Sequence, residues 1–384
     1  MNRLPAALCL LLFASSGAFG AAPRARDIGV PFDGTPGPLN AITDVAGVTV
    51  GHTTLIESAD PRHQVRTGVT AILPRGRDSG ALPAFGASFA LNGNGEMTGT
   101  AWLEESGMLE GPVLLTNTHS VGVVRDAAIA WRIRSGQADA SGYWWSLPVV
   151  AETWDGYLND INGFHVRPEH VFAALDGARG GPVEEGNVGG GTGMICHEFK
   201  CGIGTSSRRV TVGTQSYTVG VLVQANYGRR DTLRIAGVPV GEHLREHRVY
   251  TDPALAGDTG SIIIVVATDA PLLPHQLKRL AKRAALGLAR NGSYAGNGSG
   301  DLFVAFSTAN AEAVRDQTLN TAQFVGNDAI DPLFLGTVEA TEEAIVNAMV
   351  AGRDMHGQGG HYALAIPHAA LQALLRKYNR LVTP

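Results

Sequence analysis

Short apolar runs separated by glycine-rich turns make up much of the chain. The runs at 219–223, 262–266 and 302–306 are almost wholly apolar and rich in β-branched or aromatic residues. Runs of this length and composition are typical of buried strands. Glycine is unusually frequent, with 49 residues, and four of them fall within 189–193. Because glycine permits tight turns and close backbone approach, we expect many short strands joined by tight loops.

Helical periodicity lies between and after these runs. Beyond Pro274, apolar residues recur at helical spacing, and basic residues fall largely on the other side of the same helix. The apolar positions are Leu277, Leu280, Ala281, Ala284 and Leu288, and the basic positions are Lys278, Arg279, Lys282 and Arg283. We interpret the basic run as a solvated helix face rather than a nucleic-acid site. Two further helices are predicted to begin at Thr341 and at Pro367.

Strands and helices are interspersed, but without the regular alternation of a doubly wound sheet. No repeat, low-complexity tract or linker divides the sequence. Its 44 % hydrophobic and 17 % charged residues are ordinary for a globular chain with a sizeable core. These features predict one α+β or layered α/β domain. The net charge of −5 argues against general affinity for nucleic acid, which needs a basic face.

Residues 1–20 have the three-part layout of a secretory signal peptide. Arg3 gives a positive start, an apolar run follows, and Ala18 and Gly20 occupy the −3 and −1 positions of a cut before Ala21. The apolar run is shorter than the roughly 20 residues that a membrane-spanning helix needs. We therefore expect export to the periplasm or beyond, and a mature protein without a membrane span.

The mature chain keeps two cysteines, Cys196 and Cys201, with four residues between them. In an oxidising compartment they can form a local disulfide. A metal site that also uses His197 is disfavoured, because two thiols and one imidazole lack a fourth ligand. The sequence leaves a disulfide and free thiols open, and we expect neither a metal nor an organic cofactor.

Three familiar catalytic patterns fail on this chain. The glycine-rich run at 189–193 is not followed by the Lys-Ser/Thr pair of a phosphate-binding loop. Asp258-Thr-Gly260 and Asp78-Ser-Gly80 invite comparison with an aspartic protease, but neither aspartate follows the apolar strand that a shielded, shared proton requires. A G-x-S-x-G nucleophile elbow is absent from the sequence.

The pair Gly260-Ser261 stands directly before the apolar run 262–266. Glycine leaves the carbonyl of the peptide bond unshielded, and a serine at the start of a buried strand is held rigidly. If the bond is cut, Ser261 gains an α-amine of pKa about 7.7–8.0, which can serve as a general base. Spacing alone does not distinguish this chemistry from an ordinary turn.

Five segments of the sequence favour the catalytic interpretation of Gly260-Ser261 over an ordinary turn. They are Gly37–Val45, Gly189–Met194, Gly202–Arg208, Gly257–Ile262, and Asn297–Phe303 together with Phe306–Asn310. In this order they resemble the DmpA-type aminopeptidases, that is, the L-aminopeptidase / D-alanyl esterase-amidase family with its β-aminopeptidase relatives. The resemblance extends over nearly the whole mature chain.

The resemblance implies a four-layer α/β/β/α sandwich of the DmpA and ornithine acetyltransferase type, similar to N-terminal-nucleophile hydrolases. It also implies an inactive precursor that cuts itself before the serine and assembles as a tetramer of αβ units. In this sequence the α chain would comprise residues 21–260 and the β chain residues 261–384, within one folded domain.

Residue by residue, the resemblance makes Ser261 the nucleophile and the new N-terminus. Ser299 and Asp301 match the serine and acidic residue that support the nucleophile, and Asn226 matches the side-chain donor to the oxyanion. Asp301 can polarise a relay through Ser299 in place of a histidine. Whether the general base is this relay or the Ser261 α-amine remains open.

Glu152 matches the acidic residue expected to hold the free ammonium of the substrate. Trp154 falls where an aromatic residue is expected, but it lacks the hydroxyl that a tyrosine would offer to the oxyanion. The sequence thus predicts an exported, self-processing aminopeptidase acting on short peptides, amides or esters with a free N-terminal amine. An acyltransferase of the ornithine acetyltransferase type and a non-catalytic periplasmic protein are the alternatives. The preference among L-α, D-α and β-amino residues stays open.

Overall fold

The computed structural model describes residues 23–383, except residues 59, 137–144, 250–259 and 315–317. The predicted signal peptide, residues 1–20, and the Asp258-Thr259 part of the predicted cleavage segment therefore lie outside the described residues.

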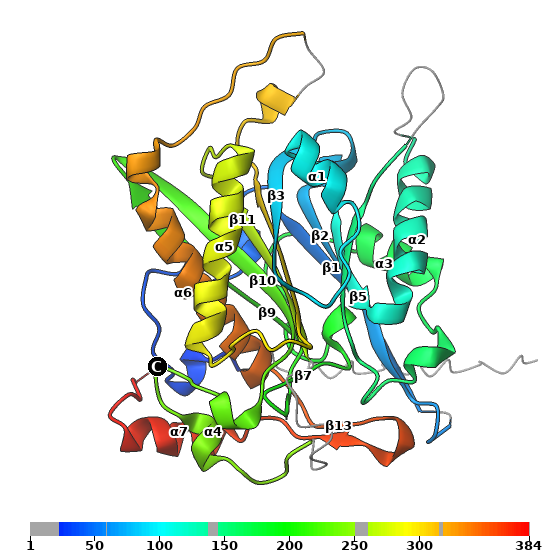
Figure 1. Cartoon of the computed structure of the whole chain (residues 1–384), viewed down its shortest axis with the longest axis vertical. Helices are drawn as coiled ribbons and strands as arrows, with labels where there is room; N and C mark the ends of the chain where they lie inside the picture. The colour runs from blue at the N-terminus through cyan, green and yellow to red at the C-terminus, as the bar shows by residue number, and fades with distance from the viewer. Residues whose placement is uncertain (1–22, 59, 137–144, 250–259, 315–317, 384) are drawn as a thin grey trace, which may run out of the picture.

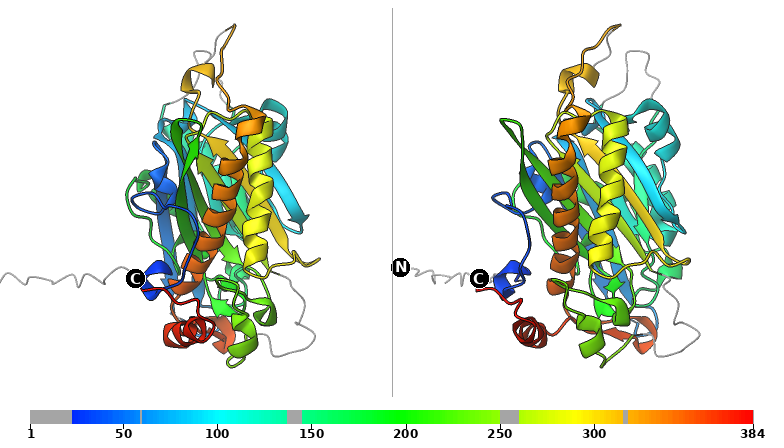
Figure 2. Two further views of the ribbon diagram at one scale, coloured as in Figure 1. Left: turned by 90° about the vertical axis from the view of Figure 1, so that its left-hand side faces the viewer. Right: turned by 60° about the vertical axis from the view of Figure 1, so that its left-hand side comes forward.

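Two sheets face each other, and helices cover the outer face of each (Figure 1). The larger sheet has the order β4 (Met108–Leu109), β3 (Ala84–Gly93), β12 (Gly300–Ser307), β11 (Ser261–Thr268), β10 (Gln215–Asn226), β9 (Ile203–Val212). The smaller has the order β1 (Thr49–Glu57), β2 (Val65–Arg77), β5 (Val113–Asn117), β6 (Val149–Thr153). The outer helices are α5 (Pro274–Arg290) and α6 (Asp331–Val350) on the larger sheet, and α2 (Val121–Arg134) and α3 (Pro168–Asp176) on the smaller. Figure 2 shows α5 and α6 lying side by side across the larger sheet. The four-layer α/β/β/α arrangement is as predicted.

Smaller elements close the ends of the sandwich. They are α1 (Thr100–Ser106), α4 (Val240–His243), α7 (His368–Lys377), and the short hairpins β7 (Ile195–Cys196) with β8 (Phe199–Lys200) and β13 (Met355–His356) with β14 (Tyr362–Ala363). None of the helices in the described part of the chain is long and apolar enough to cross a bilayer.

The unbroken apolar runs follow from burial on both faces of the larger sheet. In β11, Ile262 and Ile264 pack in the core beneath α5 and α6, whereas Ile263 and Val265 pack in the core between the two sheets. Because successive side chains point to opposite faces, a strand covered on both sides needs apolar residues at every position. The three predicted strands are confirmed as parts of β10, β11 and β12.

The helix predictions were partly correct. α5 begins at Pro274, and α7 begins directly after Pro367. The predicted helix start at Thr341 was wrong, because α6 already begins at Asp331 and Thr341 lies in its middle. The Thr341 hydroxyl donates to the carbonyl of Thr337 one turn earlier, at 2.7 Å, so it does not cap a helix N-terminus.

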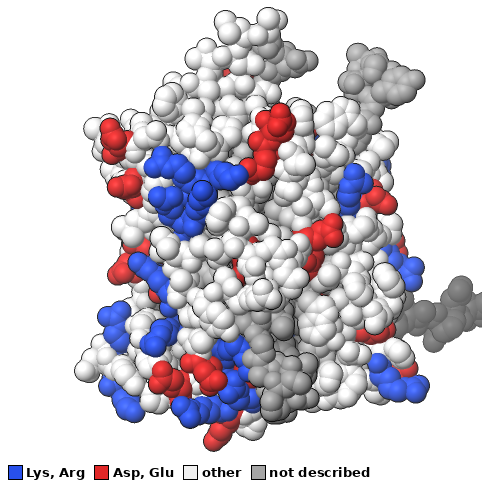
Figure 3. All heavy atoms as spheres, viewed as in Figure 1, with Lys and Arg blue, Asp and Glu red and all other residues white. Residues whose placement is uncertain are grey.

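The basic residues of α5 lie on its outer side, where Figure 3 shows a cluster of positive side chains. Lys278 forms an ion pair with Glu104. The Arg283 guanidinium of α5 lies 4.0 Å from the centre of the Phe334 ring of α6, which is a cation–π contact between the two helices. These contacts fit the interpretation of the run as an outer helix face.

Candidate active site

Three strand ends meet at one edge of the larger sheet and bring the predicted residues together. Ser261 begins β11 and pairs with Gly300 at the start of the parallel strand β12. It also pairs with Asn226, the last residue of the antiparallel strand β10. Residues far apart in sequence thus become direct neighbours, and Ser261 is only 6 % exposed.

The backbone N–H of Gly300 contacts both atoms that a cut before Ser261 would use. It donates to Ser261 Oγ at 3.2 Å and to the carbonyl oxygen of Gly260 at 3.2 Å. The second contact continues the parallel ladder by one residue beyond β11. The ladder therefore holds the Gly260–Ser261 peptide bond beside the serine hydroxyl.

Packing requires glycine at position 260. A Cβ atom there would lie 2.3 Å from the carbonyl oxygen of Asn226 and 2.5 Å from the Cα of Tyr227. Both atoms belong to the backbone at the end of β10, so they cannot move aside as a flexible side chain would. Glycine thus permits the close approach of the two chain segments as well as access to the carbonyl.

Ser299 and Asp301 form a buried pair on either side of Gly300. Ser299 Oγ donates to Asp301 Oδ1 at 2.7 Å, and both side chains are at most 1 % exposed. A hydrogen bond from a hydroxyl to a buried carboxylate favours the ionised form and orients the hydroxyl.

Strand alternation places Asp301 and the Ser261 hydroxyl on opposite faces of the sheet. Asp301 pairs with Ile262, on the face covered by α5 and α6, whereas Ser261 shares the inner face with Ile263. The backbone nitrogen of Ser261 lies at the sheet edge, between these faces. The side chain of Asp301 thus lies on the face of the sheet opposite to the Ser261 hydroxyl.

Asn226 points to the same face as its partner Ser261, and its carboxamide is held at both ends. Its Oδ1 accepts from the Ile195 N–H at 2.9 Å, and its Nδ2 donates to the carbonyl of Trp154 at 2.8 Å. A carboxamide nitrogen carries two N–H groups, so this contact uses one of them. The Ile195 contact fixes which end of the amide faces the site.

Glu152 approaches the same edge from β6 in the facing sheet. The side chain is buried; Oε1 accepts from the Glu96 N–H at 2.9 Å, and Oε2 accepts from the Thr118 hydroxyl. Gly95 stands between it and β12, since a Cβ on Gly95 would lie 3.3 Å from Glu152 Oε1 and 3.4 Å from Gly300 Cα. Gly95 thus lies between the Glu152 carboxylate and Gly300, the residue that pairs with Ser261.

Burial raises the pKa of Glu152 above its ordinary value, and the hydrogen bonds from Thr118 and Glu96 oppose this shift. Binding a cation beside a desolvated carboxylate would restore its ionised form. Trp154, two residues on, is 42 % exposed as a residue. Its backbone carbonyl accepts the hydrogen bond from Asn226 Nδ2, and its side chain has no hydroxyl to offer.

Asp155 is a buried carboxyl that the sequence did not single out. Asn159 Nδ2 donates to its Oδ1 at 3.0 Å, and burial raises the pKa of Asp155 to about 7. It directly follows Trp154, whose carbonyl holds Asn226. Asp155 is thus a buried titratable group one residue from a contact of the candidate site.

Folding should favour the protonated form of Asp155, so its contribution to stability falls as the pH rises from the unfolded value, 3.8, to about 7. The fall should approach about 1.4 kcal/mol per pH unit in this window. Asp155→Asn removes that term. The melting temperature of Asp155→Asn relative to wild type should therefore rise between about pH 5 and about pH 8. A difference that stays constant across this range would contradict the raised pKa.

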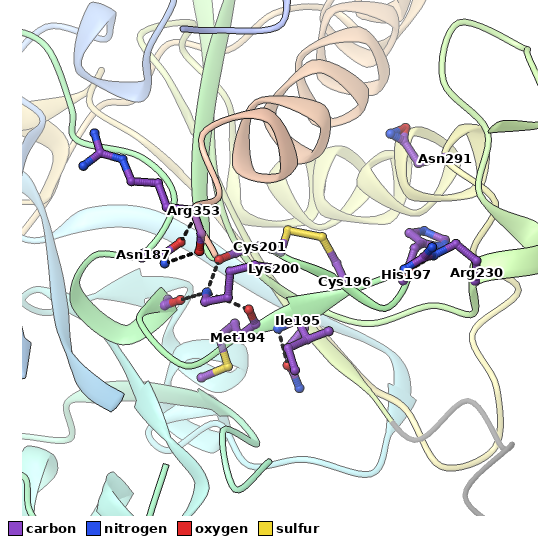
Figure 4. Close-up of a disulfide and its surroundings, with 12 residues drawn as sticks. Asn187, Met194, Ile195, Cys196, His197, Lys200, Cys201, Arg230, Asn291 and Arg353 are labelled. Atoms are coloured by element: carbon purple, nitrogen blue, oxygen red, sulfur yellow. Dashed lines mark hydrogen bonds between the residues drawn. A yellow bond between two sulfur atoms is a disulfide. The ribbon is translucent and has the colours of Figure 1, made fainter. Parts of the chain in front are cut away.

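Cys196 and Cys201 form a disulfide, with their Cα atoms 5.4 Å apart (Figure 4). This resolves the choice that the sequence left open. Both thiols are consumed, so they are not available beside His197 for the alternative metal site. The described residues contain no group of three or more His, Cys, Asp or Glu side chains that could hold a metal ion.

Sequence reasoning missed the contributions of Gly300, Thr118 and Glu96. Gly300 lies inside the segment Asn297–Phe303 that carries the resemblance, so its backbone N–H could have been suspected there. Thr118 and Glu96 carry no sequence signal, because they reach Glu152 only through the pairing of β5 with β6 and the approach of the loop after β3.

Comparisons with known proteins identify the family of the chain. The model of peptidase family S58 matches residues 40–363. The β-peptidyl aminopeptidase BapA of Sphingosinicella microcystinivorans is 52 % identical over 395 residues, covering 99 % of this chain and 98 % of the relative. The protein of the same name from Sphingosinicella xenopeptidilytica is 48 % identical over 389 residues, covering 98 % and 96 %.

A solved structure supports the same assignment. The L-aminopeptidase D-Ala-esterase/amidase of Ochrobactrum anthropi, described as a prototype for the serine aminopeptidases and a variant of the Ntn hydrolase fold, matches with a TM-score of 0.88. It is 49 % identical, and the match covers 94 % of this chain and 100 % of that one. The acyltransferase and the non-catalytic alternatives are thereby set aside. The chain belongs to peptidase family S58 and is a serine aminopeptidase with the N-terminal-nucleophile hydrolase fold.

Proposed function

We propose that the chain cuts its own backbone between Gly260 and Ser261 and that Ser261 then acts as the nucleophile. The observation that carries this proposal is the shared Gly300 N–H, which holds the Ser261 hydroxyl and the Gly260 carbonyl at one point of the sheet edge. The products would be residues 21–260 and 261–384. A denaturing gel of the purified protein with N-terminal sequencing tests the cut.

In the proposed reaction, Ser261 Oγ attacks the substrate carbonyl and passes its proton to its own α-amine, whose pKa is near neutral. Collapse of the tetrahedral intermediate releases the leaving amine, which takes that proton. Water then resolves the acyl-enzyme by the same steps. The Ser299–Asp301 pair would orient the α-amine and stabilise its protonated form.

The oxyanion needs donors aimed at the inner face of the sheet. Our candidates are the second N–H of Asn226 Nδ2 and the backbone N–H of Gly300. Asn226 and Gly300 pair with Ser261 from the two neighbouring strands, β10 and β12. A preorganised donor of this kind contributes about 10²–10³ in rate.

Glu152 would bind the free ammonium of the substrate. The chain is similar to proteins named β-peptidyl aminopeptidase, so we propose N-terminal β-amino residues among its substrates. A β-residue places its amine one carbon farther from the scissile carbonyl than an α-residue does. The separation of Glu152 from the Ser261 hydroxyl therefore sets the preference between them.

Acetylating the substrate amine should lower kcat/KM by at least roughly 100-fold, because Glu152 then faces an uncharged amide across a desolvated gap. The test compares β-alanyl p-nitroanilide and alanyl p-nitroanilide, each free and acetylated. Glu152→Gln should reduce the difference in kcat/KM between the free and the acetylated substrates. Glu104→Gln, at an exposed ion pair on α1, is the matched control. Equal turnover of blocked and free substrates would remove Glu152 from this role.

We also propose that residues 1–20 direct export, with a cut between Gly20 and Ala21, and that the αβ units assemble as tetramers. N-terminal sequencing of protein recovered from the periplasm tests the first statement. Light scattering coupled to size-exclusion chromatography tests the second.

A further inference from the structure

The β7–β8 hairpin lies against β10, and the N–H of Ile195 in β7 donates to Asn226 Oδ1. The Cys196–Cys201 disulfide closes it, and the His197 N–H donates to the carbonyl of Tyr227 at 2.7 Å. His197, next to the disulfide-bonded Cys196, thus contacts Tyr227, the residue that follows Asn226. The hairpin is a rigid support for this strand end.

Lys200 is a fully buried amine within the hairpin. Its Nζ donates to the carbonyl oxygens of Met194 at 2.8 Å, Cys201 at 2.5 Å and Gly191 at 3.5 Å. Figure 4 shows the side chain turned inward toward these carbonyls. Burying an amine is costly unless it is hydrogen-bonded, and the three convergent carbonyls supply those hydrogen bonds.

The contact between Lys200 and Asn226 passes through a single peptide group. The carbonyl of Met194 and the N–H of Ile195 belong to the same planar unit. Lys200 Nζ and the Cys201 N–H, at 3.0 Å, both bind its oxygen. The N–H at the other end donates to Asn226 Oδ1 at 2.9 Å. Donors on the oxygen fix the plane and also polarise the N–H into a better donor.

We infer that Lys200 is a positioning residue for the oxyanion site: through the Met194–Ile195 peptide it fixes which end of the Asn226 carboxamide faces Ser261. The inference rests on the oxyanion role proposed for Asn226. If the peptide plane turns, the carboxamide loses the anchor on its oxygen and keeps only the contact of its Nδ2 with the Trp154 carbonyl, so it is free to rotate away from the catalytic orientation.

A double-mutant cycle tests this. Lys200→Met keeps the length of the side chain and removes its donors. It should lower kcat roughly 10- to 100-fold with KM changed less than about twofold, because oxyanion donors act in the transition state. Asn226→Ala should lower kcat by about 10²–10³. The double variant should be no slower than Asn226→Ala alone, because Lys200 acts through Asn226. All rates are measured per mole of cleaved protein on alanyl p-nitroanilide.

Arg132→Met is the matched control. Arg132 is another buried basic side chain whose donors bind backbone carbonyls, those of Glu110 at 3.0 Å and Gly80 at 2.6 Å, but it lies on α2. Arg132→Met should lower the melting temperature, while its kcat should stay within about twofold of the wild-type value. A loss of kcat in Arg132→Met equal to that in Lys200→Met would show that burial alone explains the effect and would overturn the inference.

The outcomes separate the two proposals. Asn226→Ala with wild-type kcat contradicts the oxyanion role itself. A slow Asn226→Ala with a normal Lys200→Met contradicts only the positioning role, as does a double variant in which the two losses multiply. If Lys200→Met does not fold, Lys200→Gln replaces it in the cycle, since its amide keeps N–H donors with shorter reach. An intermediate kcat that again depends on Asn226 is then the expected result.

Discussion

Ser261→Ala should leave the protein as one chain of residues 21–384 without measurable turnover. The hydroxyl that lies beside the Gly260 carbonyl is removed, so neither the backbone nor a substrate can be attacked. Loss of a catalytic serine costs about 10⁶-fold in kcat in a well-studied serine hydrolase. Denaturing gels and intact mass measure the cut, and release of p-nitroaniline measures turnover.

Ser307→Ala is the matched control for this variant. Ser307 is a buried serine at the opposite end of β12, where its hydroxyl donates to the carbonyl of Ala270 at 2.6 Å. The control should be cut and active, with at most a lower melting temperature. If Ser261→Ala is still divided at the same bond, another protease makes the cut and the proposed self-processing is wrong.

Asp301→Asn and Ser299→Ala should each lower kcat/KM by roughly 10²-fold, and the double variant should be little worse than either. Groups that work as one unit lose function non-additively. Removing the negative charge of Asp301 also lowers the pKa of a nearby α-amine. The acid limb of the pH profile of kcat/KM should therefore move to lower pH in Asp301→Asn.

Asp269→Asn is the control for charge and size. Asp269 follows β11 at the far end of the sheet, where its Oδ1 accepts from the Thr218 N–H at 2.7 Å. It should leave the pH profile in place. Thermal melting must show that Asp301→Asn is folded, because the carboxylate also orders the start of β12. A folded Asp301→Asn with wild-type rates would assign the general-base role to the Ser261 α-amine alone.

The strands were predictable because double-sided burial leaves a local trace, an unbroken apolar run such as 262–266. The start of α6 was not, because a Thr-Glu-Glu sequence resembles a helix cap even where the helix is already under way. Thr341 is buried, and its hydroxyl donates to a carbonyl of its own helix instead of capping a helix N-terminus.

The candidate site could not be predicted from local sequence pattern. Asn226 and Ser261 are neighbours only through antiparallel pairing, and Glu152 approaches Gly300, beside Ser261, from the other sheet. Such contacts leave no periodicity in the sequence, so the family resemblance alone suggested them. Lys200 could not be predicted at all, since a lysine between two cysteines gives no sign that it will be buried.

The place of β11 and β12 in the larger sheet makes the proposed cut a one-way event. Both strands would belong to the small fragment, yet β3 and β10, from the large fragment, flank them on either side. The products would be interlocked by hydrogen-bonded ladders and could separate only by unfolding. After unfolding, two chains would have to find each other instead of one chain folding on itself. Recovery after heating should then depend on protein concentration for the cut form and be independent of it for the uncut precursor.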